Sequence, residues 1–206
     1  MNTVTSGLSV IIPTIGRKSL NTVLRQLICQ ITDSDEIIVS ADGTRPTAYE
    51  VVKNINDLRI VYTQTQASKP GDIGYSARNN AMKIAKKSHL YFLDDDDEIQ
   101  PDALSRIRSA IATHPQKILI FRINHSILGV IWKKKEMELG NVSTQMFVVP
   151  NVSQSLGKWE PMTIECGDFK FLKNCLEKYP SEIEWKEDVI ATQGMAEDRK
   201  RQIGKR

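Results

Sequence analysis

Short apolar runs alternate with amphipathic stretches through the first half of the sequence, and this alternation constrains the fold more than any other feature. Four runs have the length and composition of buried strands, at residues 8–12, 36–40, 59–63 and 89–93. Between the first two, apolar residues recur with helical spacing from Leu20 to Ile28, as on one face of an amphipathic helix. Strands and helices that alternate in this way predict an α/β fold with a mainly parallel sheet.

Proline and glycine residues mark further helix starts. Pro46 and Pro101 suit the first turn of a helix, and a glycine-bearing loop at 69–74 leads into a helix over about 75–87. The second half is less regular. There we expect strands at 118–124, 145–149 and 183–190, an exposed turn or flap at 133–141, and a helix from Asp168 to about Tyr179. No internal repeat or low-complexity linker is present, so residues 1–206 are predicted to form a single domain.

The charge distribution argues against a nucleic-acid partner. The chain of 206 residues has a net charge of +3, but five of its 28 basic residues lie at 199–206. Residues 1–198 therefore hold 23 basic and 25 acidic residues, a net charge of −2. A nearly neutral body does not offer the basic face that binding to nucleic acid requires.

The remaining composition predicts a soluble, cytoplasmic protein. Cys29, Cys166 and Cys175 are odd in number and show no CxxC spacing, which is typical of reduced cysteines. The N-terminus has neither the basic segment nor the long apolar segment of a signal peptide. The longest apolar stretch, residues 118–132, is interrupted by polar and charged residues, so we expect no membrane span.

Polar clusters follow three of the predicted strands. They are Pro13-Thr14, Ala41-Asp42-Gly43 and the aspartates from Asp94 to Asp97, called the tetrad below. Parallel sheets bind ligands in the crevice beyond the carboxyl ends of their strands. Four adjacent carboxylates repel one another unless water or a cation neutralises them, so the tetrad is either a solvated turn or a cation site. Mg²⁺ and Mn²⁺ prefer such oxygens and complete their shells with water and phosphates.

Four segments of the chain resemble the nucleotide-binding half of the inverting family 2 glycosyltransferases, which have the GT-A fold. The segments are SVIIPTIGR, EIIVSADGT, GDIGYSARNNAMKIA and LYFLDDDDEIQPDAL. The resemblance implies a three-layer, Rossmann-like sandwich in which about 8–104 bind the donor and about 105–195 carry the acceptor and catalytic half. It also implies Mn²⁺ or Mg²⁺, a nucleotide-diphosphate sugar with UDP-sugar as the first choice, and a carbohydrate or lipid-linked acceptor.

The resemblance assigns the donor site residue by residue. Pro13 and Thr14 stand where the nucleotide base binds, and Asp42 where base or ribose is contacted. Ala41 replaces the first aspartate of a usual pair. An ordinary turn is the alternative interpretation of Asp42-Gly43. The other expected donor-binding residues are Arg78, Asn79, Asp94 and Asp95, and Arg78 has the alternative role of a structural partner for the tetrad.

The metal and the catalytic base are assigned in the same way. Asp94 and Asp96 are the first candidates for metal ligands, because alternate side chains of an extended segment point together, and Asp97 is a possible substitute. Inversion needs a carboxylate that deprotonates the acceptor hydroxyl. Asp168 is chosen over Asp188, because it opens a helix as the family's base does. Gly167 replaces the usual glutamate before it, and a purely capping role for Asp168 is the alternative.

Other functions were weighed against this one. A nucleotidyltransferase is disfavoured because the N-terminus lacks a glycine-rich, lysine-bearing phosphate loop, and an aspartyl phosphatase because Asp97 follows Asp96 where a threonine pattern is usual. A catalytically silent binding module stays open through Ala41 and Gly167. The basic tail, 196–206, is solvated charge, a contact for the diphosphate, or a contact for an anionic membrane. His89, His114 and His125 show no ligand spacing and receive no role.

Overall fold

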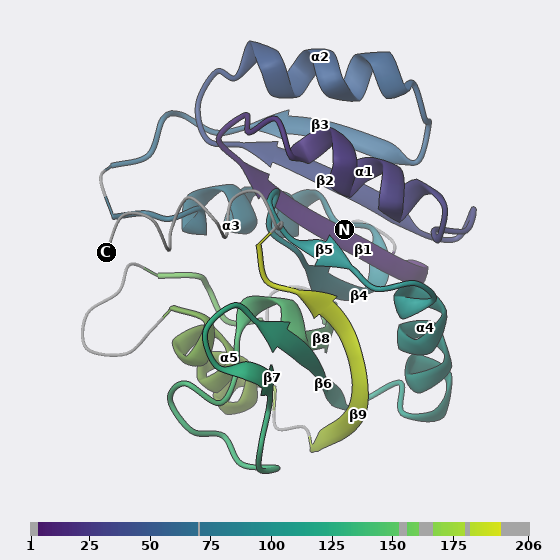
Figure 1. Cartoon of the computed structure of the whole chain (residues 1–206), viewed down its shortest axis with the longest axis vertical. Helices are drawn as coiled ribbons and strands as arrows, with labels where there is room; N and C mark the ends of the chain where they lie inside the picture. The colour runs from purple at the N-terminus through teal and green to yellow at the C-terminus, as the bar shows by residue number, and fades with distance from the viewer. Residues whose placement is uncertain (1–3, 70, 153–155, 161–166, 180–181, 195–206) are drawn as a thin grey trace.

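The computed structural model describes residues 4–69, 71–152, 156–160, 167–179 and 182–194. In these residues a curled, nine-stranded sheet carries helices along both sides (Figure 1). The strand order is β3-β2-β1-β4-β8-β6-β9-β5, with β7 beside β6. The predicted α/β class with a layered sheet is confirmed.

The first half of the chain supplies the parallel part of the sheet. Its strands are β1 (Thr5–Thr14), β2 (Glu36–Ala41), β3 (Ile60–Gln64) and β4 (Lys87–Phe92). β1 lies between β2 and β4, and β3 pairs with the outer edge of β2, all in parallel. The carboxyl ends of β1, β2 and β4 therefore meet at one edge of the sheet, as the alternating pattern predicts.

The helices of this half begin close to where the sequence places them. They are α1 (Leu20–Ile28), α2 (Pro46–Ile55), α3 (Tyr75–Ile84) and α4 (Ala103–Thr113). Pro46 occupies the first turn of α2. Of the apolar residues expected to face inward from α1, Leu20, Val23, Leu24 and Leu27 are buried and Ile28 is partly buried. α3 ends at Ile84, three residues before the predicted end, because β4 already begins at Lys87.

Antiparallel pairs enter the sheet in the second half. Its elements are β5 (Glu98–Ile99), β6 (Ile118–His125), β7 (Gly129–Ile131), the 3-10 helix η1 (Thr144–Met146), β8 (Phe147–Pro150), α5 (Gly167–Lys178) and β9 (Ile183–Thr192). β8 runs antiparallel to both β4 and β6, whereas β9 is parallel to β6. The predicted strand at 145–149 is therefore half wrong, since its first two residues belong to η1. β5 and β7 were not predicted, because two or three residues are too few for a periodic pattern.

An aromatic cluster joins the two halves and positions the start of α5. Phe92 ends β4, and its ring lies 5.2 Å from that of Trp159 and 5.4 Å from that of Phe171 in α5. The rings of Trp159 and Phe171 stack at 4.3 Å. All three residues are buried. Since the tetrad follows Phe92 almost directly, this packing holds the first turn of α5 beside the tetrad.

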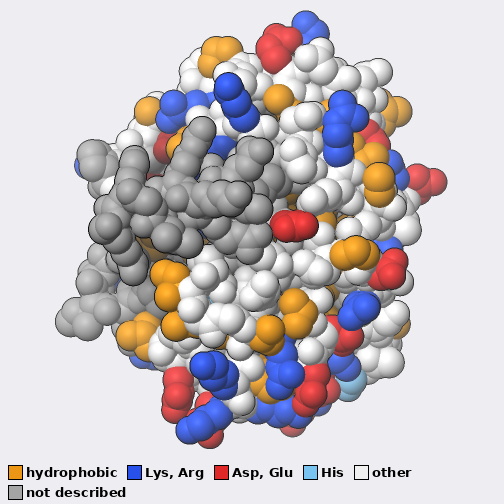
Figure 2. All heavy atoms as spheres, viewed as in Figure 1, with side chains coloured by type: hydrophobic (Ala, Val, Ile, Leu, Met, Phe, Trp, Pro, Cys, Tyr) orange, Lys and Arg blue, Asp and Glu red, His pale blue; other side chains and the backbone are white. Residues whose placement is uncertain are grey.

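The surface agrees with the charge analysis as far as it is described. On the face seen in Figure 2, basic side chains are interspersed with acidic ones among the described residues. No helix in the described part of the chain is long and apolar enough to cross a membrane. Cys29 and Cys175 are free thiols. Cys166 and the basic tail at 196–206 lie outside the described residues.

Candidate active site

A cavity of about 880 Å³ opens at the carboxyl ends of β1, β2 and β4. It is lined by most of the residues that the sequence assigned to a site, namely Pro13, Thr14, Asp42, Arg78, the tetrad and Asp168. Five segments of the chain, from positions 13 to 168, thus converge on one cavity. Asn79 is not among the lining residues. Its side chain donates to the carbonyl of Trp159 at 2.7 Å and accepts the Trp159 N–H at 3.0 Å, which anchors the segment that precedes α5.

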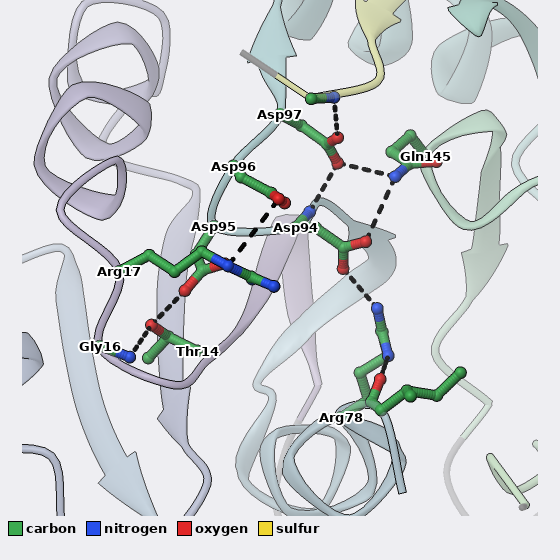
Figure 3. A network of polar contacts seen from close by, with 11 residues as sticks. Thr14, Gly16, Arg17, Arg78, Asp94, Asp95, Asp96, Asp97 and Gln145 are labelled. Atoms are coloured by element: carbon green, nitrogen blue, oxygen red, sulfur yellow. Dashed lines mark hydrogen bonds and ion pairs between the residues drawn. The ribbon is translucent and has the colours of Figure 1, made fainter. Parts of the chain in front are cut away.

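The four aspartates of the tetrad have two different environments. The side chains of Asp94 and Asp96 are 30% and 22% exposed, whereas that of Asp95 is fully buried and Asp97 is 1% exposed as a residue. Partly exposed and buried side chains therefore alternate, but the segment is a turn and not the extended segment that was expected, because the Asp97 N–H donates to the Asp94 carbonyl at 3.2 Å. In Figure 3, Arg17 contacts both Asp95 and Asp96, and Gln145 contacts both Asp94 and Asp97.

Asp95 is held by residues that follow β1. Its Oδ2 accepts a 2.5 Å hydrogen bond from the Thr14 hydroxyl, and its Oδ1 pairs with the guanidinium of Arg17 (Figure 3). Thr14 Oγ1 in turn accepts the Gly16 N–H at 2.9 Å. A buried carboxylate requires such partners, so Asp95 ties the loop after β1 to the tetrad. Arg17 was missed by the sequence analysis.

Asp94 is paired with the second arginine of the site. The Arg78 guanidinium, from α3, contacts Asp94 Oδ1, donates to the carbonyl of Ile73 at 3.1 Å, and lies 4.8 Å from the centre of the Trp159 ring. The Arg78 side chain is only 5% exposed. Packing, hydrogen bonds and the ion pair therefore all fix its orientation.

Asp97 is the most deeply engaged of the four. Its Oδ2 accepts the Asp94 N–H at 2.9 Å and the Gln145 side-chain amide at 2.8 Å, and its Oδ1 accepts the Gly194 N–H at 3.0 Å (Figure 3). Burial, and to a lesser extent the charge of Asp94, raise the pKa of Asp97 well above its usual value. The three hydrogen bonds lower this pKa but do not cancel the rise. Both oxygens are thus used to join the tetrad to η1 and to the end of β9.

Gln145 is a second residue that the sequence analysis missed. It is 1% exposed, and its amide nitrogen donates to Asp97 and, at 3.3 Å, to Asp94. Its amide oxygen accepts the Ser143 hydroxyl at 2.9 Å. Position 145 was read as the start of a strand, and nothing in a lone glutamine indicates a contact with residues 48 positions earlier.

Asp42, which also lines the cavity, holds the loop after β3 through Ser68. Its carboxylate accepts the Ser68 N–H at 2.7 Å and the Ser68 hydroxyl at 2.6 Å.

Gly74, at the start of α3, has a φ of +87°, and a Cβ there would lie 3.1 Å from the Arg78 guanidinium and 3.2 Å from Pro13. Only glycine allows this backbone to approach both residues in that conformation.

Asp168 occupies the first turn of α5, where a negative charge is favoured by the helix dipole. Its Oδ1 accepts the N–H of Phe169 at 2.8 Å. The other candidate base, Asp188 on β9, does not line the cavity and pairs with Arg106 at 3.2 Å.

His125, at the end of β6, does line the cavity, and its Nδ1 accepts the N–H groups of Ile127 and Leu128. Burial lowers the pKa of His125, although the charge of Asp168 opposes this effect.

The packing beside Asp168 explains the glycine that precedes it. A Cβ at position 167 would lie 2.1 Å from the hydroxyl oxygen of Tyr75 and 2.4 Å from its Cζ. The Tyr75 ring is buried and stacks on Trp159 at 6.1 Å. Any side chain at 167 would collide with this ring, so the position requires glycine.

The model of the family described as "Glycosyl transferase family 2" matches residues 9–179 of the chain. The chain belongs to this family. The match spans the four segments that carry the resemblance and extends through the whole of α5. The predicted membership of this family is thereby confirmed.

Similar curated proteins are glycosyltransferases of greater length. A GalNAc(5)-diNAcBac-PP-undecaprenol beta-1,3-glucosyltransferase of Campylobacter jejuni is 40% identical over 106 residues, 48% of this chain and 33% of the relative. A validoxylamine A glucosyltransferase of Streptomyces hygroscopicus is 33% identical over 126 residues, 55% of this chain and 28% of the relative. The chain thus matches about a third of the length of these relatives.

Solved structures share the fold at low sequence identity. The crystal structure of S. aureus TarS 1–349 superposes with a TM-score of 0.72 at 18% identity, covering 96% of this chain and 63% of that one. The same protein in complex with UDP-GlcNAc gives a TM-score of 0.73 at 18% identity, covering 94% and 60%. At this identity the likeness establishes the fold alone.

The carboxylates at this site suit a metal ion that is also coordinated by the phosphates of a substrate. Among the described residues, no group of three or more His, Cys, Asp or Glu side chains is arranged to enclose a metal ion. Asp95 and Asp97 are buried and accept hydrogen bonds or ion pairs on both of their oxygens. Asp94 and Asp96 are partly exposed at the cavity, although Asp94 also contacts Arg78 and Gln145 and Asp96 lies 3.9 Å from Arg17. One or two carboxylates completed by phosphate oxygens and water is the usual Mg²⁺ environment, so the residues present fit Mg²⁺ or Mn²⁺ bound together with a diphosphate.

Proposed function

We propose that the chain is a metal-dependent, inverting glycosyltransferase that moves a sugar from a UDP-sugar to an acceptor hydroxyl. The convergence of Asp42, Asp96 and Asp168 on one cavity is the observation that carries this proposal. A cavity of about 880 Å³ is large enough for a nucleotide-diphosphate sugar, since ligand sites of roughly 300–1,000 Å³ are usual. The UDP-GlcNAc complex of TarS, which shares the fold, supports a UDP-sugar as the donor.

The residues have separate tasks in the proposed reaction. Pro13, Thr14 and Asp42 line the cavity and would bind the nucleoside. Asp96, with Asp94 as the second candidate, would hold Mn²⁺ or Mg²⁺, which neutralises the departing diphosphate. Arg78 brings a fixed positive charge to the same region. These groups bind and orient the donor, and none of them needs to form a covalent bond to the sugar.

Asp168 would act at the acceptor end. Its carboxylate accepts the proton of the acceptor hydroxyl while the hydroxyl oxygen forms a bond to the anomeric carbon. The bond from that carbon to the diphosphate oxygen breaks at the same time, and the electron pair leaves with the nucleoside diphosphate. Attack from the face opposite the leaving group inverts the anomeric configuration.

The acceptor is proposed to be a carbohydrate, with a lipid-linked sugar as the first choice. The names of two relatives, from Campylobacter jejuni and Escherichia coli, include a diphosphoundecaprenol carrier. The validoxylamine A relative acts, by its name, on an acceptor without a lipid. A glycan-diphosphate-lipid analogue and a free sugar are therefore the two acceptors to compare.

The decisive variant is Asp168→Asn. Calorimetric titration with UDP, GDP, CDP and dTDP in the presence of Mn²⁺ identifies the nucleotide, and release of that nucleotide from its sugar conjugates measures turnover. We expect Asp168→Asn to bind the nucleotide as the wild type does and to lose at least 100-fold in turnover, the range of one general base. Turnover that survives in this variant would refute the base, and a wild type that binds but never turns over would indicate a silent binding module.

A further inference from the structure

Arg17 reaches into the cavity from the loop after β1 and meets two aspartates of the tetrad (Figure 3). Its Nη1 pairs with Oδ1 of the fully buried Asp95, and its Nε lies 3.9 Å from Oδ2 of Asp96. The Arg17 side chain is itself 44% exposed. An exposed, flexible side chain thus supplies the positive charge for a carboxylate that has no access to water.

The two arginines of the site differ in how firmly they are held. Arg78 is 5% exposed, and the carbonyl of Ile73 and the face of Trp159 hold its guanidinium in addition to Asp94. The polar contacts of Arg17 are with Asp95 and Asp96. Arg78 therefore belongs to the packed framework, whereas Arg17 can leave the tetrad by rotation of its own side chain.

The position of Arg17 conflicts with a cation on Asp96. A divalent cation bound to that carboxylate would lie close to the Arg17 guanidinium, which is also positive. Two like charges a few ångströms apart repel each other strongly. A diphosphate in the cavity offers Arg17 another partner, because a guanidinium matches phosphate oxygens as well as it matches carboxylate oxygens.

We propose that Arg17 and the divalent cation compete for the tetrad, and that the donor's diphosphate ends the competition by drawing the guanidinium onto itself. This inference rests on the proposed function, which supplies the cation and the diphosphate. Its consequence is an order of binding. The cation binds weakly to the protein alone and tightly together with the nucleotide, and Arg17 is the residue that imposes this order.

Titration of Mn²⁺ without nucleotide tests the competition directly, with the free ion followed by its electron paramagnetic resonance signal. We expect Arg17→Met to bind Mn²⁺ at least fivefold more tightly than the wild type. Lys18→Met is the matched control, because Lys18 is the adjacent exposed residue and its loss changes the net charge equally. It should alter the Mn²⁺ affinity by less than twofold. An unchanged affinity in Arg17→Met, or an equal gain in Lys18→Met, would overturn the proposal.

The second half of the proposal is tested by adding UDP. With UDP present, Arg17→Met should bind Mn²⁺ less than twofold more tightly than the wild type, because UDP also draws the wild-type arginine away from the tetrad. A difference in Mn²⁺ affinity that stays at fivefold would contradict the movement of Arg17 to the diphosphate. Arg17→Met could fold poorly because it leaves the buried Asp95 without its ion pair. In that case the double variant Arg17→Met/Asp95→Asn is compared with Asp95→Asn, and it should bind Mn²⁺ fivefold more tightly. Mn²⁺ binding without sugar transfer would refute the proposed function alone, whereas no Mn²⁺ binding in any variant would refute both.

Discussion

Replacement of Gly167 by alanine tests whether the residue before Asp168 is fixed by packing. The new Cβ would lie 2.1 Å, 2.4 Å and 2.6 Å from three atoms of Tyr75, far inside contact distance. A shift of the ring would disturb the aromatic cluster, because the ring stacks on Trp159, which itself stacks on Phe171 at 4.3 Å. Overpacking of a buried site costs about 1–3 kcal/mol, and the gain in helix propensity from glycine to alanine returns at most about 1 kcal/mol.

A net cost of about 2 kcal/mol should lower Tm by about 4–8 °C in a chain of this size. Thermal unfolding followed by circular dichroism measures it. The control is a double-mutant cycle with Tyr75→Ala, which removes the obstructing ring. In that background Gly167→Ala should cost nothing or should stabilise the protein. If Gly167→Ala leaves Tm unchanged, or costs as much without the tyrosine as with it, the packing explanation is refuted.

Two further predictions concern buried polar groups. Gln145→Leu removes a donor from both Asp94 and Asp97, so urea unfolding should show a loss of about 1–3 kcal/mol; equal stability would show that the amide is dispensable. Burial lowers the pKa of His89, so the unfolded chain takes up a proton that the folded chain resists, and stability should fall as the pH drops below about 6.5 and level off below the folded pKa. His89→Gln should unfold with a shallower pH dependence over this window, and an identical dependence would contradict the assignment.

The parallel half of the fold could be predicted because its information is local. Each of β1, β2 and β4 is an apolar run that ends in a polar cluster, and parallel pairing then brings the clusters together without any knowledge of long-range contacts. This is why Thr14, Asp42 and the tetrad were placed correctly at one cavity. The helix at 167–178 was also recognisable, since its apolar spacing is regular and Asp168 stands in its first turn.

The residues that were missed are those whose role depends on contacts between distant segments. Gln145 reaches Asp97 across 48 positions, and Arg17 reaches Asp95 across 78. Gln145 stands in no recognisable polar pattern, and Arg17 ends one of the four family segments without any local sign that its partner is Asp95. Asn79 shows the reverse case, because it was expected at the donor site but its side chain bonds to Trp159 and does not line the cavity. A motif thus identifies the segment, while the packing around it decides which side chain faces the ligand.

The tetrad itself illustrates why four identical residues do not have one function. Asp95 and Asp97 are buried and are satisfied by Thr14, Arg17, Gln145 and the backbone of Gly194, so they connect the loop after β1, η1 and the end of β9. Asp94 and Asp96 keep partial exposure at the cavity. A carboxylate that bridges three elements cannot easily be spared for a metal, because freeing it would leave buried donors unpaired. The environment of each aspartate in the tetrad is therefore set by its own neighbours, and it makes Asp96 the carboxylate at which the proposed cation and Arg17 would meet.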